Sequence, residues 1–250
     1  MIRIILSGCC GKMGRNVINS VNQRKDCEIV AGIDIVEDSN IGFPIFQSYN
    51  ELEVNADVII DFSNPALLSS MLEYAVKTNT AVVLATTGFS DEQIKAVEDA
   101  ANTIPVFFSY NMSLGVSLLC ELSKTAAKIL GTDFDVEIIE AHHNQKIDAP
   151  SGTAIMLANA VKEEMPDAYF EYDRHSKREK RHTNEIGIHS IRGGTIVGEH
   201  QVIFAGNDEI VTLSHSARSK AIFSQGAVNA AVFLSGKNKG VYNMSDLVKE

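Results

Sequence analysis

The stretch Ile2–Gly14, which reads IRIILSGCCGKMG, decides the fold of this chain. Its first part, Ile2–Leu6, is a short β-branched apolar run typical of a buried strand. Glycines follow at positions 8, 11 and 14, and Lys12–Val21 has the pattern of a helix. Glycines between a strand and a helix permit a tight turn, and the backbone N–H groups of the helix N-terminus can then approach a pyrophosphate. The stretch therefore predicts a dinucleotide-binding loop, with Cys10 where the commoner fingerprint has its second glycine.

Asp34 supports this interpretation. It lies about 20 residues after Gly14, at the end of a second apolar run, Glu28–Ile33. An acid at that place accepts hydrogen bonds from the ribose hydroxyls of a bound dinucleotide. A plain tight turn followed by an unrelated surface aspartate is the simpler alternative. The order of strand, glycine loop, helix, strand and acid favours the nucleotide site.

Strand and helix patterns continue to alternate in the first part of the chain. Strand-like and helix-like segments follow in the order Asp57–Phe62, Ala66–Lys77, Ala81–Leu84, Asp91–Ala101 and Ile104–Phe108. This alternation predicts an α/β fold, a Rossmann-like parallel sheet with helices on both faces. Ligands of such sheets bind at the carboxyl ends of the strands. The loops Asp61–Pro65 and Ala85–Phe89 are therefore expected to flank the ribose and the nicotinamide, although each would read as an ordinary turn in isolation.

The second part of the chain has a different pattern. The pattern predicts helices at Leu114–Leu130, Ser151–Met165 and Ala221–Leu234, and a strand at Phe134–Glu140. A polar stretch, Pro166–Glu185, precedes three strand-like runs, which are Gly187–Ile191, Ile196–Phe204 and Ile210–His215. Short turns between the consecutive strands, at Gly193-Gly194 and Gly206-Asn207-Asp208, suggest an antiparallel or mixed sheet and hence an α+β domain. The strand-like runs alternate poorly and are apolar over long stretches. One face is expected to cover the helices, and the other to form a subunit interface.

Composition limits the possible functions. The 250 residues are 45% apolar and 22% charged, as in ordinary globular proteins, and carry a net charge of -10. This charge argues against a nucleic-acid partner and against an anionic membrane surface, because both need clustered positive charge. No Cys-x-x-Cys pair occurs, and the apolar run at the N-terminus is too short for a signal peptide or a membrane span. We therefore expect a cytoplasmic protein with reduced thiols at Cys9, Cys10, Cys27 and Cys120.

The segment Glu140–Ala154, EAHHNQKIDAPSGTA, is dense in reactive groups. His142 and His143 leave a predicted strand, Lys146 follows, and Ser151-Gly152-Thr153 opens a helix whose N–H groups and hydroxyls can bind a carboxylate. A histidine can act as acid or base near neutral pH, and a lysine can supply positive charge or a proton. The alternatives are a simple N-cap beside hydrogen-bonded histidines, or a metal site. A metal is disfavoured, since neighbouring histidines on a strand point to opposite faces.

The same segment closely resembles the signature of the dihydrodipicolinate reductases, also called 4-hydroxy-tetrahydrodipicolinate reductases. The resemblance extends over nearly the whole chain, through Met13-Gly14-Arg15 in the glycine loop, IDFSNP from Ile60, TTGF from Thr86, IVGEH at Ile196–His200 and GAV…LSGK at Gly226–Lys237. It implies nicotinamide-dependent reduction of 4-hydroxy-tetrahydrodipicolinate in diaminopimelate and lysine biosynthesis, by a homotetramer. It also implies a dinucleotide-binding domain at 1–112 and 221–250, and a substrate-binding and tetramerisation domain at 113–220.

The resemblance also implies roles for individual positions. His142 would be the acid–base residue and Lys146 the proton donor. The substrate carboxylates would be bound by His143, Gly152 and Thr153. The cofactor would be held at its pyrophosphate, its adenosine ribose and its nicotinamide end by Gly8, Cys9, Cys10, Gly11, Lys12, Met13, Asp34, Ala85, Thr86, Thr87, Ser109, Tyr110, Asn111 and Met112.

The residues after Asp34 predict which cofactor is preferred. Ile35 follows directly, and the next charged residues are Glu37 and Asp38. A 2′-phosphate would face these carboxylates with no adjacent guanidinium, and Lys12 is the one nearby cation that the sequence offers. NADH is therefore expected to be preferred, with NADPH as the second possible cofactor.

Two questions stay open in the sequence. The basic stretch Arg174–His182 is either a solvated loop or the source of a cation, such as Arg181, for a dianionic substrate. The function has two alternatives: a related two-domain dehydrogenase acting on aspartate or aspartate semialdehyde, and a nicotinamide-sensing regulator. The first has no evident need for the arrangement from His142 to Thr153. The second would want a DNA-binding or partner module, for which an acidic chain of 250 residues leaves little room.

Overall fold

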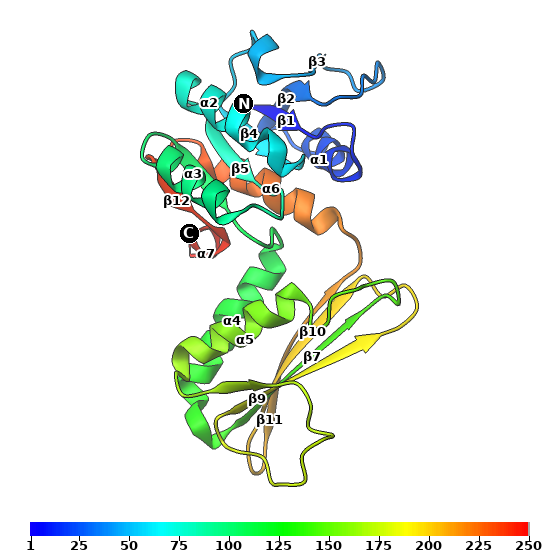
Figure 1. Ribbon diagram of the computed structural model, residues 1–250, viewed down its shortest axis with the longest axis vertical. Helices are drawn as coiled ribbons and strands as arrows, with labels where there is room; N and C mark the ends of the chain where they lie inside the picture. The colour runs from blue at the N-terminus through cyan, green and yellow to red at the C-terminus, as the bar shows by residue number, and fades with distance from the viewer. Residues whose placement is uncertain (250) are drawn as a thin grey trace. The chain divides into compact units, whose positions relative to one another are not determined.

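The computed structural model describes residues 1–249, which form two compact units (Figure 1). Unit 1 contains residues 1–114 together with the chain from 221 onward, and unit 2 contains residues 115–220. Unit 1 has a parallel sheet with helices on both faces, and unit 2 has a mixed sheet. The expected fold class is confirmed. In the part of the chain that the structure describes, no helix is long and apolar enough to cross a membrane.

The sheet of unit 1 has seven strands, all parallel, in the order β12-β6-β5-β4-β1-β2-β3. The strands are β1 Ile2–Ser7, β2 Cys27–Ile33, β3 Ile45–Phe46, β4 Val58–Asp61, β5 Ala81–Leu84, β6 Pro105–Phe108 and β12 Gly240–Tyr242. The helices are α1 Lys12–Asn22, α2 Leu68–Thr78, α3 Asp91–Ala101, α6 Ala221–Leu234 and α7 Met244–Val248, with 3-10 turns at Tyr49–Glu51 and Pro65–Leu67.

Different helices bury the two faces of this sheet. On one face, Val17 of α1 and Ala227 of α6 share a core with Ile4 of β1. On the other face, α2 and α3 pack against alternate residues of the same strands, including Ile5. Every residue of β4 and β5 is buried, which explains why both strands read as continuous apolar runs in the sequence.

The position of β1 between β4 and β2 creates the ligand-binding edge of unit 1. The chain leaves β1 toward β2 on one side, whereas β4 and β5 lie on the other side. In open parallel sheets, ligands bind at the carboxyl ends of the strands where the strand order reverses in this way. The glycine loop follows β1 directly, so the fold places it at that reversal.

Unit 2 has five strands in the order β11-β10-β7-β9-β8. Its elements are α4 Leu114–Leu130, a 3-10 turn at Gly131–Asp133, β7 Asp135–His142, α5 Gly152–Glu164, β8 Tyr169–Glu171, β9 Glu185–Arg192, β10 Gly198–Ala205 and β11 Ile210–Ala217. β10 is antiparallel to both of its neighbours, whereas β7, β9 and β8 run parallel to one another. Helices α4 and α5 cover one face of the sheet (Figure 1), where Leu119 and Leu157 pack against Ile138.

The expectation that the strand-like runs of the second sheet alternate poorly is wrong for β10. β9 and β10 do not pair, because β7 lies between them. The turn at Gly193 instead passes the end of β7, where the Gly193 N–H donates to the carbonyl of His142 at 2.9 Å. β10 alternates regularly, with His200 and Val202 buried and Gln201 exposed between them. The short strand β8 also lies inside the polar stretch Pro166–Glu185.

Candidate active site

The glycine loop joins β1 to α1 in unit 1. Gly8 has a φ of +77°, and a Cβ there would lie 2.5 Å from the carbonyl oxygen of Phe62. A Cβ at Gly14 would overlap the carbonyl oxygen of Gly8. Both positions therefore require glycine. Gly11 is the N-cap of α1 and offers no side-chain acceptor, so the backbone N–H groups of the first turn are presented to an anion.

Asp34 follows β2 and lies against the glycine loop. Its Oδ2 accepts a hydrogen bond from the Cys10 N–H at 2.9 Å, and its Oδ1 accepts one from the Val36 N–H at 3.1 Å. Each carboxylate oxygen keeps a further lone pair for a ribose hydroxyl. The structure thus brings together the two parts of the expected nucleotide site.

A cation lies beside Asp38, the second acid that follows Asp34 in the sequence. Arg15 on α1 forms an ion pair with Asp38 at 2.6 Å. The expectation that Lys12 is the one nearby cation is therefore wrong. The sequence hides this guanidinium, because α1 and the chain after β2 meet only in the fold. The side chain of Ile35, between the acids, is 83% exposed.

The next two strand ends bring further polar groups to the same edge. Asp61 ends β4 and is buried, and the Ser63 hydroxyl donates to it at 2.5 Å. Burial raises the pKa of Asp61, against the opposing hydrogen bonds of neighbouring hydroxyls. Thr86, after β5, is buried, whereas Ala85 is half-buried and Thr87 is exposed. These loops therefore lie where the sequence placed them, at the ends of adjacent strands.

The segment of residues 109–112 follows β6, the next strand of the same sheet. Tyr110 is 73% exposed, but Asn111 and Met112 are buried. The Ser109 hydroxyl donates to the carbonyl of Asn111 at 3.0 Å. The side chain of Met112 belongs to the core, and its carbonyl oxygen fills the space that a Cβ at Gly226 would need. The contact of Met112 with the cofactor stays a prediction, and the buried side chain leaves only the main chain for it.

The paired cysteines of the loop are thiols. Their Sγ atoms lie 3.9 Å apart, and all four cysteines of the chain are free. Burial raises the pKa of Cys9 to about 12 and also raises that of Cys10. Cys9 is fully buried, so only its backbone can face a pyrophosphate. A carboxylate oxygen of Asp34 lies within 4.8 Å of both sulfurs. Sequence spacing does not reveal this group, because the cysteines follow β1 and the acid follows β2.

In unit 2, β7 ends in an acid and a histidine that face the same side. Glu140 is fully buried, and its Oε2 lies 2.6 Å from Nδ1 of His142. Arg192, at the end of β9, donates to both carboxylate oxygens at 2.8 and 2.7 Å. Burial alone would raise the pKa of Glu140, but the hydrogen bonds from Arg192 and His142 outweigh it and lower the pKa to about 2. The histidine therefore lies against a charged carboxylate at neutral pH.

A second buried histidine lies beside the first. The ring of His200, on β10, is edge-on to that of His142, with centroids 5.2 Å apart. Burial lowers the pKa of His200 to about 4, so its ring is neutral. Its Nε2 lies 3.0 Å from the Ser151 hydroxyl, which also accepts from the Ala154 N–H as the N-cap of α5. Sequence reasoning missed His200, since only strand pairing brings it to this place.

Lys146 lies in the loop between β7 and α5. Its Nζ pairs with Asp148 at 2.8 Å, and its N–H donates to the carbonyl of His143 at 3.1 Å. Gly152 opens α5 and is exposed, His143 and Thr153 are half-buried, and no acid lies in the first turn of the helix. The candidate catalytic and carboxylate-binding groups thus gather at one end of the sheet in unit 2, as the sequence segment suggested.

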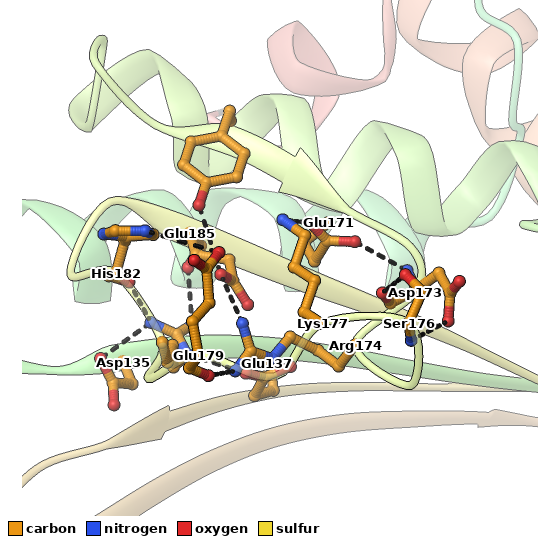
Figure 2. A network of polar contacts seen from close by, with 12 residues as sticks. Asp135, Glu137, Glu171, Asp173, Arg174, Ser176, Lys177, Glu179, His182 and Glu185 are labelled. Atoms are coloured by element: carbon orange, nitrogen blue, oxygen red, sulfur yellow. Dashed lines mark hydrogen bonds and ion pairs between the residues drawn. The ribbon is translucent and has the colours of Figure 1, made fainter.

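The basic stretch, residues 174–182, lies in the polar network of Figure 2. Arg181 donates to Glu137, to Asp135 and to the carbonyls of Val136, His182 and Glu185, so all three of its nitrogens are engaged. Arg174 pairs with the buried Glu185, and Lys177 pairs with Glu171. Neither expectation describes Arg181, because its side chain is only 16% exposed and its donors are used within the unit.

Two family models match the chain. The one described as dihydrodipicolinate reductase, N-terminus, matches residues 2–112, and the one described as dihydrodipicolinate reductase, C-terminus, matches residues 115–248. Relatives named 4-hydroxy-tetrahydrodipicolinate reductase are 48% identical over 250 residues in Clostridium novyi (strain NT) and 49% identical over 251 residues in Caldanaerobacter subterraneus subsp. tengcongensis. Each match covers 100% of this chain and 99% of the relative.

Solved structures agree with these matches. A dipicolinate-bound dihydrodipicolinate reductase from Paenisporosarcina sp. TG-14 has a TM-score of 0.81 and 28% identity, and the match covers 99% of each chain. A mutant meso-DAP dehydrogenase from Clostridium tetani E88 has a TM-score of 0.56 at 17% identity and shares the fold alone. Since both halves of the chain match the two family models in order and the relatives match it end to end, the chain belongs to the dihydrodipicolinate reductase family.

Proposed function

We propose that this chain reduces 4-hydroxy-tetrahydrodipicolinate to tetrahydrodipicolinate with a nicotinamide cofactor, in diaminopimelate and lysine biosynthesis. The observation that carries the proposal is the cluster at the end of β7, where His142 lies on a charged Glu140 beside Lys146 and the start of α5. The similar structure from Paenisporosarcina holds dipicolinate, a ring dicarboxylate. Such a ligand calls for cationic and N–H-rich anchors, which this cluster supplies.

Unit 1 fits a dinucleotide. We assign the pyrophosphate to the backbone of residues 8–13, the adenosine ribose to Asp34, and the nicotinamide end to residues 85–87 and 109–112. The support is the loop geometry: glycines stand where a Cβ would enter the backbone, and the first turn of α1 has no side-chain cap. When bound, the cofactor supplies the hydride, and the protein supplies its orientation.

Unit 2 supplies charge and a proton. His143, Gly152 and Thr153 would hold the carboxylates, with the N-terminal dipole of α5 favouring negative charge. Loss of the 4-hydroxyl group as water gives a conjugated imine, and hydride addition to that imine leaves an electron-rich ring that must take up a proton. Lys146 donates that proton, and His142, which is hydrogen-bonded to Glu140, acts as the acid–base partner.

We further propose that NADH is preferred over NADPH. Asp34 would accept hydrogen bonds from both ribose hydroxyls but repel a 2′-phosphate, and Ile35 offers no positive charge beside it. Arg15 softens this repulsion without removing it, since its guanidinium is paired with Asp38.

A homotetramer in the cytoplasm completes the proposal. Among the described residues of unit 2, helices cover one face of the sheet, and on the other face the side chains of Ile191 and Ile210 are 51% and 68% exposed. Exposed apolar side chains on one open sheet face are typical of a subunit interface.

NADH oxidation by the purified chain tests the activity. We expect oxidation in a mixture of pyruvate, aspartate semialdehyde and the preceding synthase of the pathway, and none when the synthase is left out. Oxidation with aspartate or aspartate semialdehyde alone would favour the related dehydrogenase instead. No oxidation in any mixture would contradict the proposed function.

A further inference from the structure

Glu140 is a buried acid to which the family resemblance assigned no role. We propose that Glu140, held by Arg192, is a positioning residue for His142, and that Arg192 also fixes the loop that carries Lys146. This inference rests on the function proposed above for His142 and Lys146, and it names the groups that orient them.

The carboxylate of Glu140 is surrounded by donors. Oε2 faces Nδ1 of His142 at 2.6 Å and accepts from Arg192 at 2.8 Å. Oε1 accepts from Arg192 at 2.7 Å and from the Ser151 N–H at 3.1 Å. The side chain is 0% exposed, so these four contacts replace its hydration. An ionised carboxylate only accepts hydrogen bonds, which places a proton on Nδ1 of His142.

This arrangement makes Nε2 of His142 the nitrogen that exchanges a proton. Gly198 on β10 leaves room there, because a Cβ at that position would lie 3.1 Å from Nε2. The neighbouring ring of His200 is neutral, because burial lowers its pKa and the nearby His215 and Lys146 lower that pKa further. Glu140 is therefore the charged group that bonds directly to the imidazole, and it holds both the ring orientation and the tautomer.

Arg192 joins this pair to the next part of the site. The same guanidinium that binds Glu140 also donates to the carbonyl of Asp148 at 2.6 Å, and the Asp148 carboxylate pairs with Lys146. The residues after Arg192 hold the chain on the other side, since Asn144 N–H donates to the Gly194 carbonyl at 3.2 Å. Hydrogen bonds from the end of β9 and the turn after it thus hold the chain on both sides of Lys146, at Asn144 and at Asp148.

Glu137→Gln is a matched control for Glu140→Gln. Glu137 lies on the opposite face of β7 and is also bonded to an arginine and a histidine, Arg181 and His189. A structural role would make the two variants alike, with a lower midpoint of thermal unfolding and normal turnover. A positioning role predicts that only Glu140→Gln lowers kcat, on the order of 10²-fold, with little change in KM or NADH affinity.

NMR of the holoenzyme with 15N-labelled histidine supplies the second readout. Long-range 1H–15N correlations, assigned by comparison with His142→Asn, should show Nδ1–H in the wild type and loss of that form in Glu140→Gln. Arg192→Lys keeps the charge but not the two-pronged contact, so about a tenfold loss of kcat is expected. The proposal is overturned if Glu140→Gln keeps both its kcat and Nδ1–H, or if Glu137→Gln loses as much activity. If the wild type fails in the coupled assay, the proposed function falls, but the NMR still decides the positioning of His142.

Discussion

At the scale of single residues, the fold holds the two candidate catalytic groups differently. His142 is bonded at 2.6 Å to an acid with no exposed surface, whereas Lys146 pairs with Asp148, whose side chain is 59% exposed. A buried pair keeps its geometry, but an exposed pair exchanges readily with water. Lys146 is thus able to leave its partner for a substrate while the imidazole stays in place.

Removing either group should slow the chemistry. We expect His142→Ala and Lys146→Ala each to lower kcat about 10²-fold or more, the usual scale for acid–base groups. NADH affinity, measured by fluorescence titration, should stay unchanged, since both residues belong to unit 2. Lys162→Ala serves as the control, because Lys162 lies on α5 and its ammonium group stacks on the ring of Phe170. Near-normal turnover in both test variants would show that the roles are wrong.

His200 makes the fold sensitive to acid. Burial lowers its pKa to about 4 in the folded chain, whereas an unfolded histidine titrates near 6.5. Between these values the unfolded state binds the extra proton, so stability is lost as the pH falls from about 6.5 to about 4, by at most about 3 kcal/mol. The free energy of unfolding, measured with urea at several pH values in this range, should depend less on pH in His200→Gln than in the wild type. A slope equal to that of the wild type would rule this residue out, and the exposed His182 provides the control as His182→Gln.

At the scale of elements, the end of β2 should set the choice of cofactor. We expect NADH to be used with the higher kcat/KM, and Ile35→Arg to shift the ratio toward NADPH by about tenfold, or about 1.4 kcal/mol. Arg15→Ala should lower the efficiency with NADPH more than that with NADH, because Arg15 is the cation paired with Asp38. The ratio is measured at low salt. A tenfold preference of the wild type for NADPH would contradict the proposal.

The network of the basic stretch should stabilise β7 and β9 without touching the substrate. Arg181→Ala leaves Glu137 and Asp135 without their shared partner, so we expect a loss of about 2 kcal/mol in the free energy of unfolding. KM for the substrate should not change, because the guanidinium has no donor left for it. A large rise in KM with unchanged stability would instead assign Arg181 to the substrate.

The sequence predicts elements that carry a sustained pattern and misses contacts made by pairing. The apolar runs of β1, β4 and β5 were visible because both faces of their sheet are buried. The strands β3, β8 and β12 have two or three residues each, too few for any period to emerge. Glu140 stands two residues before His142 in the sequence but was assigned no role there, and Arg192 reaches both residues from another strand, a relation that no local pattern encodes.

At the scale of the whole molecule, the open face of the second sheet bears on assembly. We expect a homotetramer through the open face of the second sheet, where Ile191 and Ile210 are exposed. Light scattering at micromolar concentration should give four times the chain mass of 27.2 kDa. Ile210→Glu should shift the mass downward, because a charge opposes burial of that face. A stable wild-type monomer would refute the expected interface.

The return of the chain to unit 1 through α6 has a consequence for how the chain folds while the ribosome makes it. Ser20 on α1 lies 3.3 Å from Ser224 on α6, and the two residues are 204 positions apart. During translation, one apolar face of the unit 1 sheet is therefore covered by α1 but still lacks α6 while residues 115–220 are made. Unit 2 is continuous in sequence and can close first. Unit 2 can thus be complete before unit 1, and the uncovered apolar face of unit 1 is exposed to aggregation during that delay.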